Sequence, residues 1–249
     1  MLPFDRKGAR AAWADARKAE TAYNTRLRQV AVQVGSLVST MAPKGFVRDL
    51  QAIMGILDRY ATMLEPWAGA AAEYMMRDVE RRNERLWRKN GNDISKAIRT
   101  EVLHSSQGVQ FRRMMDEQVD LIQSIPRDAA QRVHDITTGA LYSGKRPEEI
   151  AQQIMRQRDV SISKARLIAR TEVSRTAATF MQARAMAAGS EGYIWRTSKD
   201  ADVRDTHKAM EGRYVRWDTP PKTDASLDPY HAGCGPNCRC FAEPVLPDL

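Results

Sequence analysis

The stretch SISKARLIARTEVSRTAATFMQARAMAAG, residues 161–189, marks the point at which this chain changes from one kind of structure to another. Apolar residues recur through it at helical spacing, which predicts one long helix with a buried stripe. The stripe consists of Ile168, Ala169, Val173, Ala177, Phe180, Met181 and Ala188. Gly189 supplies the stop, because glycine readily adopts the left-handed conformation that ends many helices.

Beyond Gly189 the composition favours strands. GYIWRT (192–197) and RYVRW (213–217) are rich in β-branched and aromatic residues, and each predicts a short strand. CRCFAEPVL (238–246) predicts a third strand after a long loop. Residues 190–249 are therefore expected to form a small α+β module.

One short helix is expected between the first two strands, over DADVRDTHKAMEG (200–212). Asp200 is placed to cap its start and Gly212 its end. Asp200, Arg204 and His207 fall at i, i+4 and i+7, so a helix would bring them to one face and direct the imidazole toward the cysteine loop. The alternative for His207 is a half-buried structural histidine.

The chain upstream of residue 189 reads as helix throughout. FVRDLQAIMGILDRYATML (46–64) carries a broad apolar stripe, and Pro147 suits the first turn of a later helix. The predicted fold class is mainly α with a small C-terminal α+β module, in which short antiparallel strands surround one helix behind a long helical N-terminal body. We expect residues 1–140 to dock onto a partner and the helices over 147–188 to precede the module.

The net charge of +8 is distributed unevenly along the chain. Of the 39 Lys and Arg and the 31 Asp and Glu, 8 and 10 lie in residues 190–249, which leaves 31 and 21 for residues 1–189. A basic body suits a DNA surface or an acidic protein surface. An Arg-rich solvated helix face would have the same composition.

No part of the sequence is expected to cross a membrane or to direct secretion. The first twenty residues interleave charge throughout, and the most apolar stretch, VAVQVGSLVSTMA (30–42), is too short and too polar to span a bilayer. We therefore expect a cytosolic protein, in which thiols stay reduced and a disulfide is the least favoured role for cysteine.

All three cysteines lie in HAGCGPNCRCF (231–241). A zinc site needs four thiolate or imidazole ligands, and the candidates are His207, Cys234, Cys238 and Cys240, with His231 as a substitute ligand. The spacing C-x₃-C-x-C is not that of a standard zinc ribbon. Zinc binding, structural thiols that pack the turn, and a redox role all stay open, and zinc is the only cofactor indicated.

These segments together resemble the phage head morphogenesis family of phage Mu F-like minor head proteins. Its pattern is R-T-E-x-x-R on a helix, W-x-T, D-x-x-x-R-x-x-H-x-x-x-x-G and a closing C-R-C. The matching positions are Arg170, Thr171, Glu172, Arg175, Trp195, Thr197, Asp200, Arg204, His207, Gly212, Cys238, Arg239 and Cys240. The chain departs from the pattern at Asp202, where many members carry a basic residue.

The resemblance implies that residues 141–249 are the head morphogenesis domain. It implies a virion protein of a tailed phage or prophage that binds the portal protein, with scaffold or major capsid protein as further partners, and that acts in procapsid assembly, DNA packaging or DNA ejection. The host cytoplasm during assembly and the capsid interior at the portal vertex are the expected locations. The basic body could also contact phage DNA.

Two alternatives remain from the residues themselves. One is a metal-dependent, nuclease-like enzyme whose metal is held by His207 and the cysteines. The other is a DNA-binding protein carried inside the capsid. No carboxylate-rich site for magnesium is visible, and a zinc ion enclosed by four Cys and His ligands has no open position for water. We therefore expect no enzymatic activity.

Overall fold

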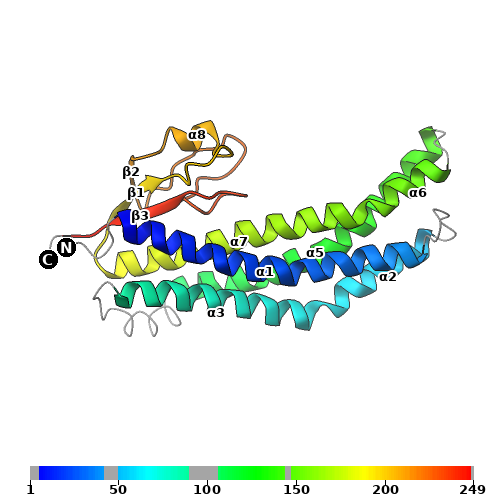
Figure 1. Cartoon of the computed structure of the whole chain (residues 1–249), viewed down its shortest axis with the longest axis horizontal. Helices are drawn as coiled ribbons and strands as arrows, with labels where there is room; N and C mark the ends of the chain where they lie inside the picture. Colours follow the sequence, from blue (N-terminus) through cyan, green and yellow to red (C-terminus); the bar gives the residue numbers. More distant parts are fainter. Residues whose placement is uncertain (1–5, 42–49, 90–105, 144–146, 248–249) are drawn as a thin grey trace. The chain divides into compact units, whose positions relative to one another are not determined.

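Helices dominate the computed structural model, which describes residues 6–41, 50–89, 106–143 and 147–247 (Figure 1). The predicted fold class is confirmed. In chain order the elements are α1 (Arg6–Met41), α2 (Leu50–Met63), α3 (Glu65–Lys89), α5 (Ser106–Ser143), α6 (Pro147–Met155), α7 (Gln157–Ala187), β1 (Gly192–Arg196), α8 (Asp205–Lys208), β2 (Tyr214–Arg216) and β3 (Phe241–Val245). Among the described residues, no helix is both long and apolar enough to span a membrane.

The chain divides into two compact units that are not continuous in sequence. Unit 1 contains Met1–Ala22, Tyr74–Met114 and Arg170–Leu249, and unit 2 contains Tyr23–Glu73 and Met115–Ala169. The two regions expected from the sequence, 1–140 for docking and 141–249 for the family domain, are defined by function and not by internal contacts. They stay predictions.

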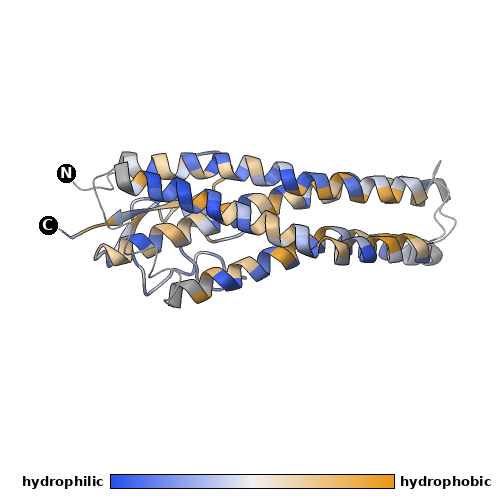
Figure 2. Ribbon diagram, turned by 90° about the horizontal axis from the view of Figure 1, so that it is seen from below, coloured by the Kyte–Doolittle hydropathy of each residue, from blue (hydrophilic) through white to orange (hydrophobic). Residues whose placement is uncertain are grey.

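Unit 2 is a helical bundle held together by apolar burial. Tyr23 on α1 donates a hydrogen bond to the buried amide of Gln118 on α5 (3.0 Å), and Gln123 on α5 donates to the Ala61 carbonyl on α2 (3.1 Å). Hydrophilic and hydrophobic residues are interspersed along the long helices, as an amphipathic bundle requires (Figure 2). The core includes Leu27, Val34, Ile53, Leu57, Ile122, Ile125 and Ile154.

Unit 1 contains a three-stranded antiparallel sheet with the order β2-β1-β3. The central strand β1 alternates its side chains, so Tyr193 and Trp195 both enter the core and are 0% exposed. Phe241 of β3 lies 5.9 Å from the ring of Trp13 in α1, measured between ring centroids. The rest of this core includes Trp87, Met181, Ala185, Val215, Trp217, Ala232, Cys238, Cys240 and Ala242.

Helix α7 ends where the sequence predicts. Gly189 has a φ of +84°, and the backbone N–H of Ser190 bonds to the Ala185 carbonyl (2.9 Å), which closes the last turn. Of the predicted stripe, Ala177 and Ala188 are only partly buried. The fully buried members are Ile168, Ala169, Val173, Phe180 and Met181.

The expected helix over 200–212 is wrong in its extent. Helix α8 covers only Asp205–Lys208, with Arg204 at its N-cap position in an extended conformation. Asp200 does not cap it. Its carboxylate accepts a hydrogen bond from the backbone N–H of Asp202 (3.2 Å), and such a local Asx turn competes with helix formation.

Replacement of Gly192 by alanine is expected to destabilise the protein by about 1–3 kcal/mol. A Cβ at this position would lie 2.4 Å from the backbone oxygen of Val215, so strand β2 would have to move away from β1. Urea unfolding measures the effect.

The matched control is Gly139→Ala in α5, where an added Cβ meets nothing within 4 Å. This change should stabilise the helix by up to about 1 kcal/mol. Equal effects of the two substitutions would contradict the packing at Gly192.

Candidate functional site

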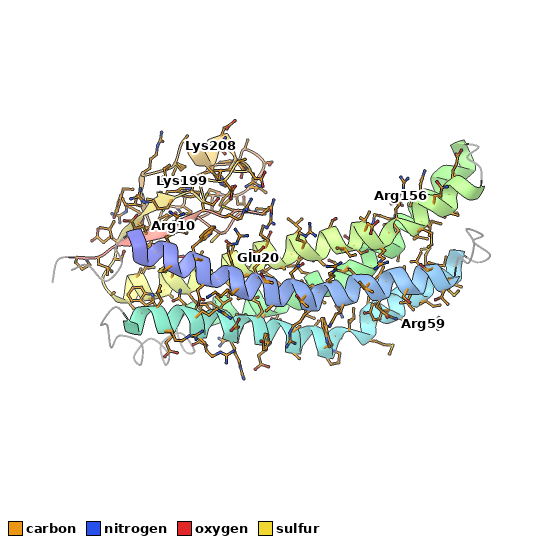
Figure 3. The ribbon with its side chains drawn as sticks, viewed as in Figure 1. Arg10, Glu20, Arg59, Arg156, Lys199 and Lys208 are labelled. Atoms are coloured by element: carbon orange, nitrogen blue, oxygen red, sulfur yellow. The ribbon has the colours of Figure 1, made fainter. Side chains whose placement is uncertain are left out.

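The cysteine loop, residues 231–240, is bound to helix α7 by two residues of the family pattern. The backbone N–H of Asn237 donates to Thr171 Oγ1, and Arg170 donates to Asn237 Oδ1, both at 2.9 Å. Asn237 has a φ of 56°, a left-handed conformation that asparagine tolerates better than most residues. Arg170 also contacts Glu20 (3.4 Å). Glu20 lies on α1 (Figure 3). The loop therefore has a defined position on the helix.

The RTEVSR segment (170–175) of α7 contains an ion pair with a buried acidic member. Glu172 is only 5% exposed, and Arg175 lies 3.7 Å from its carboxylate. The two residues are three positions apart on the helix, which brings their side chains together. The segment borders the core of unit 1 because α7 carries buried residues on several faces there, including Thr176 and Thr179.

Three of the candidate metal ligands meet at one point. His207 Nδ1 lies 3.6 Å from the sulfur of Cys238 and 3.5 Å from that of Cys240, and all three ligand atoms lie within 4.8 Å of one another. The three residues are 2–3% exposed. The predicted approach of the His207 imidazole to the cysteine loop is thus observed, although α8 is much shorter than expected.

The other two candidates lie outside this group. Both ring nitrogens of His231 have partners, the Trp217 carbonyl (3.1 Å) and the Tyr193 hydroxyl (3.3 Å), and burial lowers the pKa of the imidazole. Burial also raises the pKa of the Cys234 thiol to about 12. Cys234 is consequently a protonated thiol within the turn.

The two grouped cysteines shift each other's pKa in opposite directions. Cys240 donates a hydrogen bond to the sulfur of Cys238, which lowers the pKa of Cys238 against the opposing effect of burial. The same bond, together with burial, raises the pKa of Cys240, whereas the Trp195 indole acts in the opposite direction. The backbone N–H of Cys240 also approaches the Cys238 sulfur at 3.4 Å.

The outer nitrogen of His207 is held by residues that the sequence analysis missed. His207 Nε2 lies 2.9 Å from the hydroxyl of Tyr230, which donates a hydrogen bond to Asp224. Both residues belong to the segment before the cysteines, which the sequence indicates only as a loop. No spacing rule connects them to His207, because a loop has no fixed periodicity.

A cavity of about 70 Å³ adjoins the cluster. Arg239 spans its acidic residues, with contacts to Asp200 (3.1 Å) and Asp202 (2.9 Å). Asp202 is the position at which the chain departs from the family pattern. Its carboxylate forms an ion pair with Arg239, the arginine of the C-R-C motif. Arg204 donates to the Pro236 carbonyl (2.8 Å). Asp200, Arg204 and His207 thus line one cavity without sharing a helix.

Thr197, which follows β1, is bound to Glu211, which precedes β2. The backbone N–H and the hydroxyl of Thr197 both donate to one carboxylate oxygen of Glu211, at 2.6 and 2.7 Å. Desolvation opposes ionisation, but these bonds and the nearby Arg196 outweigh it and lower the pKa of Glu211 below 4.5. The family threonine therefore fixes the turn that joins α8 to β2.

Replacement of Glu211 by glutamine is expected to destabilise the protein by about 1–2 kcal/mol at neutral pH, because charged hydrogen bonds are lost. A lowered carboxyl pKa contributes stability that is present above its unfolded value of 4.5 and is lost as the pH falls through the folded value. Unfolding curves of the two proteins should therefore converge in acid. Glu191→Gln, at a side chain that is 78% exposed, is the control. A difference that stays constant down to acidic pH would contradict this role.

Comparison with known proteins finds a family match over the region that contains α7, the sheet and the cysteine loop. Residues 131–243 match the family described as "Phage Mu protein F like protein". An uncharacterized protein of Haemophilus influenzae (strain ATCC 51907 / DSM 11121 / KW20 / Rd) is 31% identical over 128 residues, which are 51% of this chain and 28% of that protein. The chain thus spans little more than a quarter of that relative. No solved structure matches the chain.

Proposed function

We propose that this protein, whose residues 131–243 match the phage Mu protein F-like family, is a minor head protein that binds the portal of a tailed phage or prophage. Membership indicates a phage head morphogenesis protein and a component of the virion. The match over this region is the observation that carries the proposal. Portal binding, with a role in procapsid assembly, DNA packaging or ejection, is the specific function we assign.

The contacts of the family residues support a structural role. Thr171 binds the cysteine loop, Thr197 binds Glu211, and Arg239 binds Asp200. Each of these side chains is engaged in holding one segment of the module to another. The comparisons give no support to the nuclease-like alternative.

The basic helices are suited to a position near packaged DNA. Arg77, Arg81 and Arg85 are exposed at intervals of four on α3, so they lie on one side of that helix. Arg81 also contacts Asp78 (3.5 Å), which reduces its charge toward a ligand. Duplex DNA binding by the full chain should weaken with increasing salt, with a slope that falls when these three arginines are changed to glutamine.

Portal binding is tested by isolating procapsids through a tag on the cognate portal protein. We expect the full chain to co-purify at a few copies per portal. A portal protein from an unrelated phage, expressed at the same level, is the control. Equal recovery with both portals, or none with the cognate one, would contradict the proposal.

A further inference from the structure

The cluster of His207, Cys238 and Cys240 has the dimensions of a metal site. Zinc–sulfur bonds of about 2.3 Å and zinc–nitrogen bonds of about 2.0–2.1 Å place tetrahedral nitrogen and sulfur ligands about 3.6 Å apart. The distances from His207 Nδ1 to the two sulfurs are 3.6 and 3.5 Å. At these distances one zinc ion can bind all three atoms.

We propose that His207 Nδ1, Cys238 Sγ and Cys240 Sγ bind one zinc ion, whose fourth ligand is a water molecule from the adjoining cavity. The proposal concerns the module alone. It does not depend on portal binding, and either can fail without the other.

The hydrogen bonds around His207 orient its lone pair toward the sulfurs. Tyr230 donates its hydroxyl proton to Asp224, so its oxygen accepts from His207 Nε2. The imidazole proton is consequently on Nε2, and Nδ1 carries the lone pair that faces Cys238 and Cys240. Metal-binding histidines commonly donate their other N–H to such a polar partner, which fixes the tautomer and the ring orientation.

The surroundings of the two sulfurs also fit thiolate ligands. The backbone N–H of Cys240 points to the Cys238 sulfur (3.4 Å), as is suitable for a negatively charged atom. The ring of Trp195 contacts that of His207 with centroids 5.5 Å apart. The site is thus enclosed by fixed groups on its inner side.

The outer side leaves room for the fourth ligand. The cavity of about 70 Å³ is lined by all three ligand residues and is large enough to hold water. Its carboxylates are engaged, since Asp200 and Asp202 both contact Arg239. The ring nitrogens of His231 have other partners, and Cys234 is not among the residues whose ligand atoms meet. Three protein ligands with one open position therefore distinguish this site from a closed structural zinc site.

Metal content of the full, reduced chain tests the site directly. We expect about one zinc per chain by elemental analysis. Replacement by cobalt should produce the d–d bands of tetrahedral coordination and a thiolate charge-transfer band. Added azide should shift the d–d bands because it displaces water. Absence of stoichiometric zinc together with absence of these bands would overturn the site, as would a Cys238–Cys240 disulfide that persists under reducing conditions. Bands that do not respond to azide would overturn the open position.

Variants separate the ligands from their neighbours. Cys238→Ser and Cys240→Ser should lose the stoichiometric metal, whereas Cys234→Ser in the same loop should retain it. Tyr230→Phe should fold and bind zinc about 10–100-fold more weakly, because only the support of His207 is lost. A Cys234→Ser protein that loses its metal, or a Tyr230→Phe protein with unchanged affinity, would overturn the assigned geometry. The cobalt spectrum of the unaltered chain keeps the test valid if a cysteine variant fails to fold.

Discussion

Replacement of Trp195 by alanine is expected to lower the free energy of unfolding of unit 1 by about 3–5 kcal/mol, the usual cost of removing a buried tryptophan or phenylalanine side chain. Trp195 is 0% exposed and lies on the central strand, where it pairs with Ala242 across the sheet. Its ring contacts both Tyr193 and His207, with centroids 6.4 and 5.5 Å away. The cavity left by the substitution would therefore open between the sheet and the cysteine cluster.

Urea unfolding monitored by circular dichroism measures this loss. Met186→Ala is the control, because Met186 is 46% exposed in the last turn of α7. Its replacement should change the free energy of unfolding by no more than about 0.5 kcal/mol. If Trp195→Ala cost less than about 1 kcal/mol, the sheet would not be packed around this residue as described.

Removal of the proposed zinc ion is expected to have the second large effect. A ligand present at 1,000 times its dissociation constant stabilises the folded state by about 4 kcal/mol. A chelator should therefore lower the melting temperature of the reduced wild-type chain substantially. The same chelator should leave the melting temperature of Cys238→Ser almost unchanged, since that variant has no metal to lose.

Thermal unfolding in matched buffers, with and without chelator, checks this prediction. Cys234→Ser is the control and should respond to the chelator as the wild type does. An equal response from Cys234→Ser and Cys238→Ser would mean that the effect does not arise at the site of His207, Cys238 and Cys240.

The elements with strong local signals could be predicted from the sequence. The three strands lie within their predicted stretches, and Gly189 ends α7 because its left-handed conformation is a property of the residue itself.

Helix α8 could not be predicted correctly. Its expected first turn is replaced by an Asx turn at Asp200 and by contacts to Arg239, which lies 39 positions further along the chain. Such distant contacts outweigh a weak helical preference.

Buried packing also outweighs an unfavourable residue in α5. Pro126 lies inside this helix, where proline removes a backbone hydrogen bond and usually bends or ends a helix. Ile122, Ile125 and Ala129 around it are all 0% exposed, so burial maintains the helix through the proline. Nothing in the local sequence reveals that those residues have partners.

The candidate site was predictable in its chemistry but not in its selection of ligands. The clustered cysteines and His207 predict a metal site, and the structure brings together three of the five candidate ligands. His231 lies outside the group because its two ring nitrogens are bound to the Trp217 carbonyl and the Tyr193 hydroxyl. The support of His207 by Tyr230 and Asp224 likewise depends on the course of a loop. These choices are made by tertiary contacts.

Quantitative mass spectrometry of purified mature particles tests the central claim, that this chain is a minor head protein. The particles are produced in cells that carry the complete cognate head module, and the chain is counted relative to the portal protein. We expect a few copies per portal in particles that have packaged DNA. Complete absence of the chain from these particles would contradict its role as a component of the virion.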